Sequence, residues 1–247
     1  MTKPNLTRQV GATSVFTALV CVATISFTVY VPSTKGYFNI GETMIYTAAI
    51  LFGPFVGAFS GGVGSMLADT ILGYYYYAPA TLVIKAFEGF IVGFLSKKGQ
   101  FLAKAYTKRE LRLFAVKMGV LVGSLVGLVG FIYYSGFVEL YSVAFSMENP
   151  ALTFFIPAEL WFGVGVLAVL MIAVFVFISE PEYGFTIISC IFGGLSMVLG
   201  YFLYQQFFLG VFAIAEVPVN IGQMAIGLIV AIPLVRVVKR ALPQLKS

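Results

Sequence analysis

Ionisable side chains inside apolar segments are the residues of this sequence whose types and spacing could do chemistry. Lys85 and Glu88 are three residues apart, so on a helix they share a face and can neutralise each other. Asp69 lies in the preceding apolar segment and is a second candidate partner for Lys85. An ionised group within hydrocarbon is costly, so each of these residues needs a partner, a water-filled cavity or a function.

Polar residues of several apolar segments or segment ends fall at about one depth, in the outer third of a bilayer, given a helical rise of about 1.5 Å per residue. Four carboxylates face a single lysine there, and three amides add hydrogen-bonding capacity. This surplus favours a pocket for a neutral, polar heteroaromatic or a cationic ligand, and an ion-pair network with a purely structural role is the alternative. The predicted binding residues are Asn39, Glu42, Lys85, Glu88, Glu216, Asn220 and Gln223. Asp69 and Tyr76 are expected just behind them.

The sequence lacks the signatures of catalysis and of metal or nucleotide binding. It contains no histidine, which excludes an HExxH zinc site, a Ser-His dyad and any histidine metal site. It contains no Gly-Lys dipeptide, so it has no Walker A loop. Cys21 and Cys190 lack metal-type spacing and are interpreted as small packed hydrophobic residues. We therefore predict a protein that is not an enzyme, holds no cofactor or metal, and takes any energy coupling from ions or partner subunits.

The composition indicates an all-α, polytopic membrane protein formed as a single membrane domain, residues 1–247. Of these residues, 60% are hydrophobic and 10% charged, which is too apolar for the surface of a water-soluble protein. A membrane-crossing helix needs about 20 apolar residues. The eight candidate spans are 10–31, 40–53, 54–73, 78–97, 112–134, 158–179, 183–210 and 212–238. Because Gly53 and Pro54 separate the short second span from the third, these two could form one broken or re-entrant pair, giving seven spans.

The basic residues indicate how the chain is oriented in the membrane. If both termini are cytoplasmic, the residues at the inner face are Lys3, Arg8, Lys97, Lys98, Lys104, Lys108, Arg109, Arg112, Lys117, Arg236, Lys239, Arg240 and Lys246. The net charge of +5 therefore reports membrane topology and not nucleic-acid binding. The Tyr74–Tyr77 run falls at the outer end of the third span, where it predicts an interfacial aromatic belt or, alternatively, a stacking surface for substrate.

Small residues recur at four-residue spacing in two of the predicted spans. Such stripes let helix backbones approach closely in lipid, either within the chain or against another membrane subunit. The two stripes are Gly53, Gly57, Gly61 and Ser65, and Gly119, Gly123 and Gly127.

Several short segments occur in a characteristic order and spacing, namely Tyr37–Glu42, Leu51–Pro54, Gly61–Asp69, Ala78–Pro79, Lys85–Gly89 and Glu216–Asn220. Together they resemble a known family, the substrate-binding S components of energy-coupling factor (ECF) transporters, in the riboflavin and hydroxymethylpyrimidine branch. The resemblance covers about residues 8–98 and 184–240. Since such proteins usually have six spans, residues 105–180 are interpreted as an insertion of two further helices.

The resemblance also implies a mode of action. The loop from Val31 to Phe38 would cover an extracellular site, and two ATPase subunits would drive the cycle through a shared transmembrane T component. Small residues on the first span would contact that T component, and the candidates are Ser14, Thr17, Ala18 and Cys21. In riboflavin binders the last span carries an asparagine followed three residues later by a lysine. Here Asn220 matches the asparagine and Gln223 replaces the lysine, which favours a pyrimidine- or pyridoxine-like substrate over riboflavin.

The sequence therefore predicts a multi-pass subunit of the cell membrane that binds a vitamin or vitamin precursor and has no nucleic-acid partner. Two other hypotheses remain. In the first, the chain is a stand-alone, ion-coupled carrier in which Asp69, Lys85 and Glu88 relay protons. In the second, it is a membrane scaffold whose polar residues only hold helices together.

Overall fold

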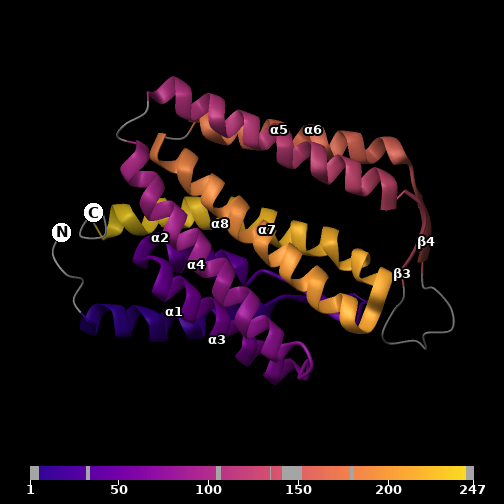
Figure 1. Cartoon of the computed structure of the whole chain (residues 1–247), viewed down its shortest axis with the longest axis horizontal. Helices are drawn as coiled ribbons and strands as arrows, with labels where there is room; N and C mark the ends of the chain where they lie inside the picture. Colours follow the sequence, from indigo (N-terminus) through magenta and orange to yellow (C-terminus); the bar gives the residue numbers. More distant parts are fainter. Residues whose placement is uncertain are drawn as a thin grey trace. The chain divides into compact units, whose positions relative to one another are not determined.

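The computed structural model describes residues 6–31, 34–103, 107–133, 135–140, 152–178 and 181–242 (Figure 1). Pro32 and Ser33 of the predicted covering loop, and the basic residues Lys3, Lys104 and Lys246, lie outside the described residues. Eight α-helices occur among the described residues, at the positions of the eight predicted spans. They are α1 (Leu6–Ser26), α2 (Glu42–Phe52), α3 (Pro54–Leu72), α4 (Ala78–Ala103), α5 (Lys108–Tyr133), α6 (Ala158–Ile178), α7 (Pro181–Leu209) and α8 (Val217–Ala241). The fold class predicted from composition, an all-α polytopic membrane protein, is confirmed.

The chain divides into two compact units. The described residues of Met1–Thr107 and Glu182–Ser247 form the first unit, which contains α1 to α4, α7 and α8. Those of Lys108–Pro181 form the second unit, in which α5 and α6 pack against each other. Strands β3 (Gly136–Leu140) and β4 (Leu152–Ile156) pair in antiparallel fashion between those two helices.

Five helical stretches of the described residues are long and apolar enough to cross a membrane, and all five belong to the first unit. In contrast, α2 has 11 residues and a length of about 16 Å, roughly half of the hydrocarbon thickness. It ends at Gly53, whose φ of 97° lies in the left-handed region that glycine adopts freely, and Pro54 starts α3. Helices α2 and α3 then pack against each other, as expected for one broken pair.

The first predicted span, 10–31, was wrong at its outer end. Helix α1 ends at Ser26, and residues Thr28–Val31 form strand β1, which pairs in antiparallel fashion with strand β2 (Gly36–Asn39). Threonine, valine and tyrosine favour an extended backbone, and the following Pro32 cannot continue a helix. The strand pairing satisfies backbone groups that would otherwise need helical partners.

The glycine stripe on α3 is used within the chain. A Cβ atom at Gly57 would lie 2.8 Å from the carbonyl oxygen of Gly89, and one at Gly61 would lie 2.8 Å from the carbonyl oxygen of Lys85. These approaches bring α3 against α4 at backbone distance. In the second unit, a Cβ atom at Gly123 would lie 2.6 Å from the carbonyl oxygen of Gly165, so the stripe on α5 packs against α6.

A seven-residue 3-10 helix, η1 (Gly210–Glu216), connects α7 to α8. It starts at Gly210, whose φ is 56°, and is followed directly by α8, with Pro218 in the first turn. This turn places Glu216 at the start of α8 and brings Asn220 and Gln223 onto its first two turns. Both amides are buried, so the start of α8 faces the interior of the first unit.

Candidate functional site

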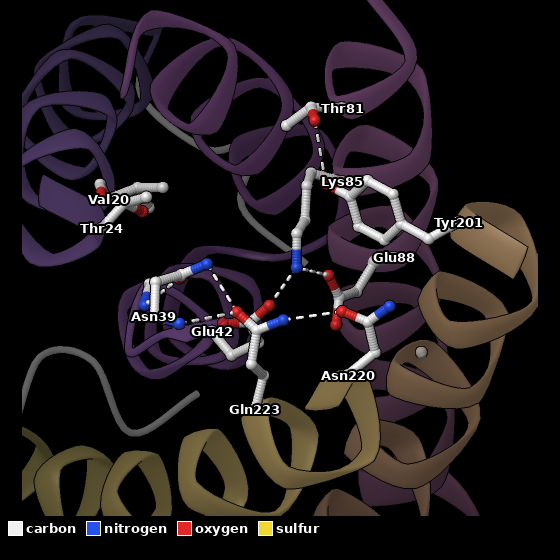
Figure 2. Close-up of polar contacts among 12 residues, drawn as sticks. Val20, Thr24, Asn39, Glu42, Thr81, Lys85, Glu88, Tyr201, Asn220 and Gln223 are labelled. Atoms are coloured by element: carbon white, nitrogen blue, oxygen red, sulfur yellow. Dashed lines mark hydrogen bonds and ion pairs between the residues drawn. The ribbon is translucent and has the colours of Figure 1, made fainter. Parts of the chain in front are cut away.

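A buried ion cluster joins α2 to α4. The ammonium group of Lys85 donates to Oε1 of Glu42 and, over 3.1 Å, to Oε2 of Glu88 (Figure 2). The hydroxyl of Tyr46 donates to the other oxygen of Glu88 over 2.9 Å. Lys85 is 3% exposed and both glutamates are fully buried. With all groups ionised the cluster carries one net negative charge, so Lys85 has no positive charge to spare for an anionic ligand.

The structure therefore realises the Lys85–Glu88 pairing proposed from their three-residue spacing and adds Glu42 from another helix. It does not show the alternative ion pair between Asp69 and Lys85. Asp69 instead accepts a hydrogen bond from the hydroxyl of Tyr37 on strand β2. Burial and the neighbouring Asp69 carboxylate raise the pKa of Tyr37 above its ordinary value, so the phenol stays protonated and donates.

A chain of amides connects strand β2 to α8. The backbone N–H of Gly41 donates to Oδ1 of Asn39 over 2.8 Å, and both the N–H and the Nδ2 of Asn39 donate to Oε1 of Gln223. Nε2 of Gln223 then donates to Oδ1 of Asn220 over 2.7 Å (Figure 2). Because backbone N–H groups can only donate, they fix the orientation of Asn39 and Gln223, and hence that of Asn220.

Thr34 and Lys35, in the turn of the β1–β2 hairpin, form hydrogen bonds with the α3–α4 loop and with η1. Thr34 donates from its hydroxyl to Oε2 of Glu216, and its carbonyl oxygen accepts from the hydroxyl of Tyr77 over 3.1 Å. The hydroxyl of Tyr76 donates to the carbonyl oxygen of Lys35 over 2.7 Å. Lys35 has a φ of 52°, the left-handed conformation of a tight turn.

These groups surround a polar cavity of about 40 Å³ in the first unit, which is room for about three water molecules. Six of the predicted site residues line it, namely Asn39, Asp69, Lys85, Glu216, Asn220 and Gln223. Glu42 and Glu88 are not part of its wall and act on it through Lys85. Tyr76 does not line it and is 45% exposed at the hairpin turn.

The remaining lining residues are not among the binding residues predicted individually from the sequence, although Gly36 and Tyr37 lie in the expected covering loop and Tyr77 in the tyrosine run. They are Thr24, Gly36, Tyr37, Ser65, Tyr77, Thr81, Tyr201 and Gln205. Of the Tyr74–Tyr77 run, it is Tyr77 that faces the cavity, and the ring of Tyr201 lies 6.4 Å from it, centroid to centroid. A signal for two of these residues existed, because Tyr201 and Gln205 are four residues apart on an apolar helix and therefore share one face.

Tyr201 also joins the ion cluster to the cavity. Its hydroxyl donates to Oγ1 of Thr81 over 2.9 Å, and the ammonium group of Lys85 lies 5.7 Å from the centre of its ring. A cation at this distance from an aromatic face is favourably placed. The cavity wall thus combines aromatic faces with carboxyl, amide and hydroxyl groups from helices α1, α3, α4, α7, η1 and α8 and from strand β2.

Comparison with known proteins identifies the family. The family model of the ECF-type riboflavin transporter S component matches residues 5–178, more than half of the chain. The chain belongs to this family. ECF S components are parts of transporters and not enzymes, and the apolar helices agree with a multi-pass protein of the cell membrane.

The matched range differs from the one expected for the S-component resemblance, 8–98 and 184–240. It continues through the segment interpreted as an insertion and ends before α7, η1 and α8, which carry Gln205, Glu216, Asn220 and Gln223. The insertion at 105–180 and the assignment to one branch of the S components therefore stay predictions.

Two curated relatives are similar to parts of this S component. A protein of Pyrococcus woesei described as an "Uncharacterized protein in gap 3'region" is 53% identical over 78 residues, covering 32% of this chain and 52% of the relative. A UPF0397 protein of Streptococcus agalactiae serotype Ia is 27% identical over 125 residues, covering 50% of this chain and 66% of the relative. The chain thus spans about half to two thirds of the length of these relatives.

Proposed function

We propose that this protein is the membrane-embedded substrate-binding subunit of an ECF-type importer, which captures a vitamin or vitamin precursor from outside the cell. The observation that carries the proposal is the cavity, where polar side chains from widely separated parts of the chain meet in an otherwise apolar bundle. Some of their atoms lack hydrogen-bond partners among the described residues, including Oδ2 of Asp69 and Oε1 of Gln205. Buried polar atoms without partners are costly, and a ligand would provide the partners.

The substrate that we propose is pyrimidine- or pyridoxine-like. Riboflavin, for which the matching family is described, is the competing candidate. Gln223 stands where riboflavin binders of the family carry a lysine, and its Oε1 is engaged by two donors of Asn39, an accepting role that a lysine cannot fill. The small cavity also supports a compact ligand, since a larger one requires the hairpin and the tyrosines to move further.

Release to the inside would be driven by a transmembrane T component and two ATPase subunits. The face of α1 that turns away from the unit supports docking to the T component, because Ser14 and Ala18 are exposed on it and only Val20 and Thr24 of that helix are buried. Thr17 and Cys21 lie at its edge, partly buried. We further propose that both termini are cytoplasmic and that residues 105–180 are an insertion of two helices into a six-helix core.

The experiment is mass spectrometry of small molecules retained by the gently purified protein, followed by calorimetric titration with pyridoxine, hydroxymethylpyrimidine and riboflavin. Retention of a vitamin-like compound, bound with sub-micromolar affinity, is expected. If the protein retains riboflavin alone, the proposed pyrimidine- or pyridoxine-like substrate is wrong, but the proposed role as a substrate-binding subunit stands. If the protein retains and binds no small molecule at all, the substrate-binding role is excluded and the scaffold hypothesis is favoured.

The excess of carboxylates over lysine around the cavity also suits an ion-coupled carrier. Proteoliposomes that contain only this chain distinguish the two functions. The importer proposal expects no net uptake without the T component and the ATPases. Uptake by the lone chain that stops when the ion gradient is collapsed would replace the importer proposal with the carrier.

A further inference from the structure

The free hydrogen-bonding atoms of the cavity define a polarity that a ligand must complement. Oδ2 of Asp69 and Oε1 of Gln205 are acceptors without a hydrogen-bond partner among the described residues. Asp69 is 3% exposed and Gln205 is 1% exposed, and both line the cavity. Each of these two oxygen atoms can therefore accept a hydrogen bond from a donor that a ligand brings.

The orientation of the Gln205 amide follows from its neighbour. The hydroxyl of Tyr77 has one hydrogen, which it donates to the carbonyl oxygen of Thr34 over 3.1 Å. It must therefore accept from Gln205, whose Nε2 lies 2.8 Å away. This fixes Nε2 toward Tyr77 and leaves Oε1 as the acceptor that remains.

One donor balances these two acceptors. Oδ1 of Asn220 accepts from Gln223 at the end of the amide chain, so the Nδ2 group of Asn220 takes no part in that chain. Asn220 also lines the cavity. A ligand that fills the site thus presents N–H donors to Asp69 and Gln205 and one acceptor to Asn220.

The charged residues around the cavity further restrict the class of ligand that can bind. Among the described residues, Lys85 is the one basic residue that lines the cavity, and two carboxylates already hold it. Asp69 and Glu216, also in the wall, carry carboxyl groups and add no positive charge. A phosphate or carboxylate group on the ligand would therefore find no free cation, whereas the rings of Tyr37, Tyr77 and Tyr201 offer flat surfaces for a heteroaromatic.

We infer that the substrate is an unphosphorylated heteroaromatic amine, whose amino group binds between Oδ2 of Asp69 and Oε1 of Gln205 and whose ring acceptor binds Nδ2 of Asn220. This inference rests on the proposed substrate-binding function and sharpens it. An amino group donates to both acceptors. A carbonyl oxygen at the same position is itself an acceptor, so it cannot bond to either of them, and all three oxygen atoms stay unpaired.

Matched ligand pairs test the inference on the full-length protein. Calorimetric titration compares hydroxymethylpyrimidine that carries an exocyclic amine with its analogue that carries a carbonyl oxygen there, and pyridoxamine with pyridoxine and pyridoxamine phosphate. In at least one pair the amine is expected to bind at least tenfold more tightly than its partner without the amine. The phosphate is expected to weaken binding by a further tenfold or more.

Substitutions in the protein test which residues cause the preference for an amine. Asp69→Asn keeps an oxygen for Tyr37 and turns the free acceptor into a donor, so the amine preference should fall at least tenfold. Gln205→Met should weaken amine binding about tenfold, and Gln206→Met, on the exposed side of the same helix, should leave it unchanged. Thermal unfolding in detergent checks that each variant is folded. If Asp69→Asn does not fold, Gln205→Met alone tests the preference for the amine.

Equal affinity for both members of each pair, or a preference that survives in Asp69→Asn and Gln205→Met, would overturn the inference. So would retention by the purified protein of a compound without a donor group, although the subunit role would then stand. A protein that binds none of these compounds and retains no other small molecule would overturn the proposed function itself.

Discussion

Lys85 on α4 and Glu42 in the first turn of α2 form an ion pair that is closed to solvent, with exposed fractions of 3% and 0%. Glu88 holds the same ammonium group from one helical turn further along α4. When all three groups are ionised, two negative charges and one positive charge meet at the contact between the half-length helix α2 and the longer α4. This cluster is a buried polar connection between the short helix α2 and the rest of the first unit.

Replacing Lys85 by methionine should destabilise the protein by about 3–5 kcal/mol, because Glu42 and Glu88 are left buried without their cation. Lys98→Met, at an exposed position of the same helix, should have an effect below about 0.5 kcal/mol. Thermal and denaturant unfolding of the purified protein in detergent measures both. A Lys85→Met protein as stable as the Lys98→Met control would show that the cluster contributes nothing to folding.

The contact between α3 and α4 should tolerate no side chain at Gly57. A Cβ atom there would lie 2.8 Å from the carbonyl oxygen of Gly89, so Gly57→Val forces the two backbones apart and should cost about 1–3 kcal/mol. Gly11→Val on α1 is the control, since no atom lies within 4 Å of its Cβ position. Expression level and the midpoint of thermal unfolding report the difference. Equal stability of the two variants would contradict the close packing.

The hairpin turn should control how fast a ligand leaves. Tyr77→Phe removes the hydroxyl that holds the Thr34 carbonyl and the Gln205 amide. Loss of these two hydrogen bonds, at about 0.5–1.5 kcal/mol each, should raise the dissociation rate of the retained ligand about fivefold or more. Tyr75→Phe is the matched control in the same loop, because Tyr75 is 68% exposed. Ligand exchange followed by stopped-flow fluorescence compares the dissociation rates of the two variants. Equal rates would show that the Tyr77 hydroxyl does not slow ligand release.

Much of the helical framework could be predicted from the sequence, because hydrocarbon imposes long apolar segments. The end of α1 could not, since the residues of β1 are as apolar as a helix end and only their pairing with β2 decides their conformation. The two short hairpins were missed for the same reason. Local composition does not reveal a partner strand that lies a few residues further along the chain.

The site residues that the sequence predicts are those whose burial in an apolar segment is energetically costly. Charged and amide residues inside apolar segments stand out in a sequence, which is how Asp69, Lys85 and Asn220 were found. Tyrosines do not stand out, because they are common at membrane interfaces and in apolar cores alike. The role of Tyr77, as opposed to the predicted Tyr76, depends on which side of one turn faces inward. Gln205 carried the same signal as Asn220 and was overlooked.

Asn220 offers the most direct test of the binding site. Asn220→Ala removes the Nδ2 donor that we assign to the ligand and the oxygen that Gln223 donates to. Affinity for the retained substrate should fall at least tenfold, the effect of about one lost hydrogen bond and one unpaired buried group. Since Gln223 keeps its two bonds from Asn39, the fold should persist, with a change in stability of about 1–2 kcal/mol.

The control for Asn220→Ala is Gly222→Ala on the same helix, where an added Cβ would meet only Phe38 at an ordinary 3.5 Å. Calorimetric titration with the retained substrate and thermal unfolding are measured for both variants. Reduced affinity confined to Asn220→Ala, with both proteins folded, is the expected outcome. Unchanged affinity in a folded Asn220→Ala protein would remove Asn220 from the site and with it the donor on which the proposed ligand polarity depends.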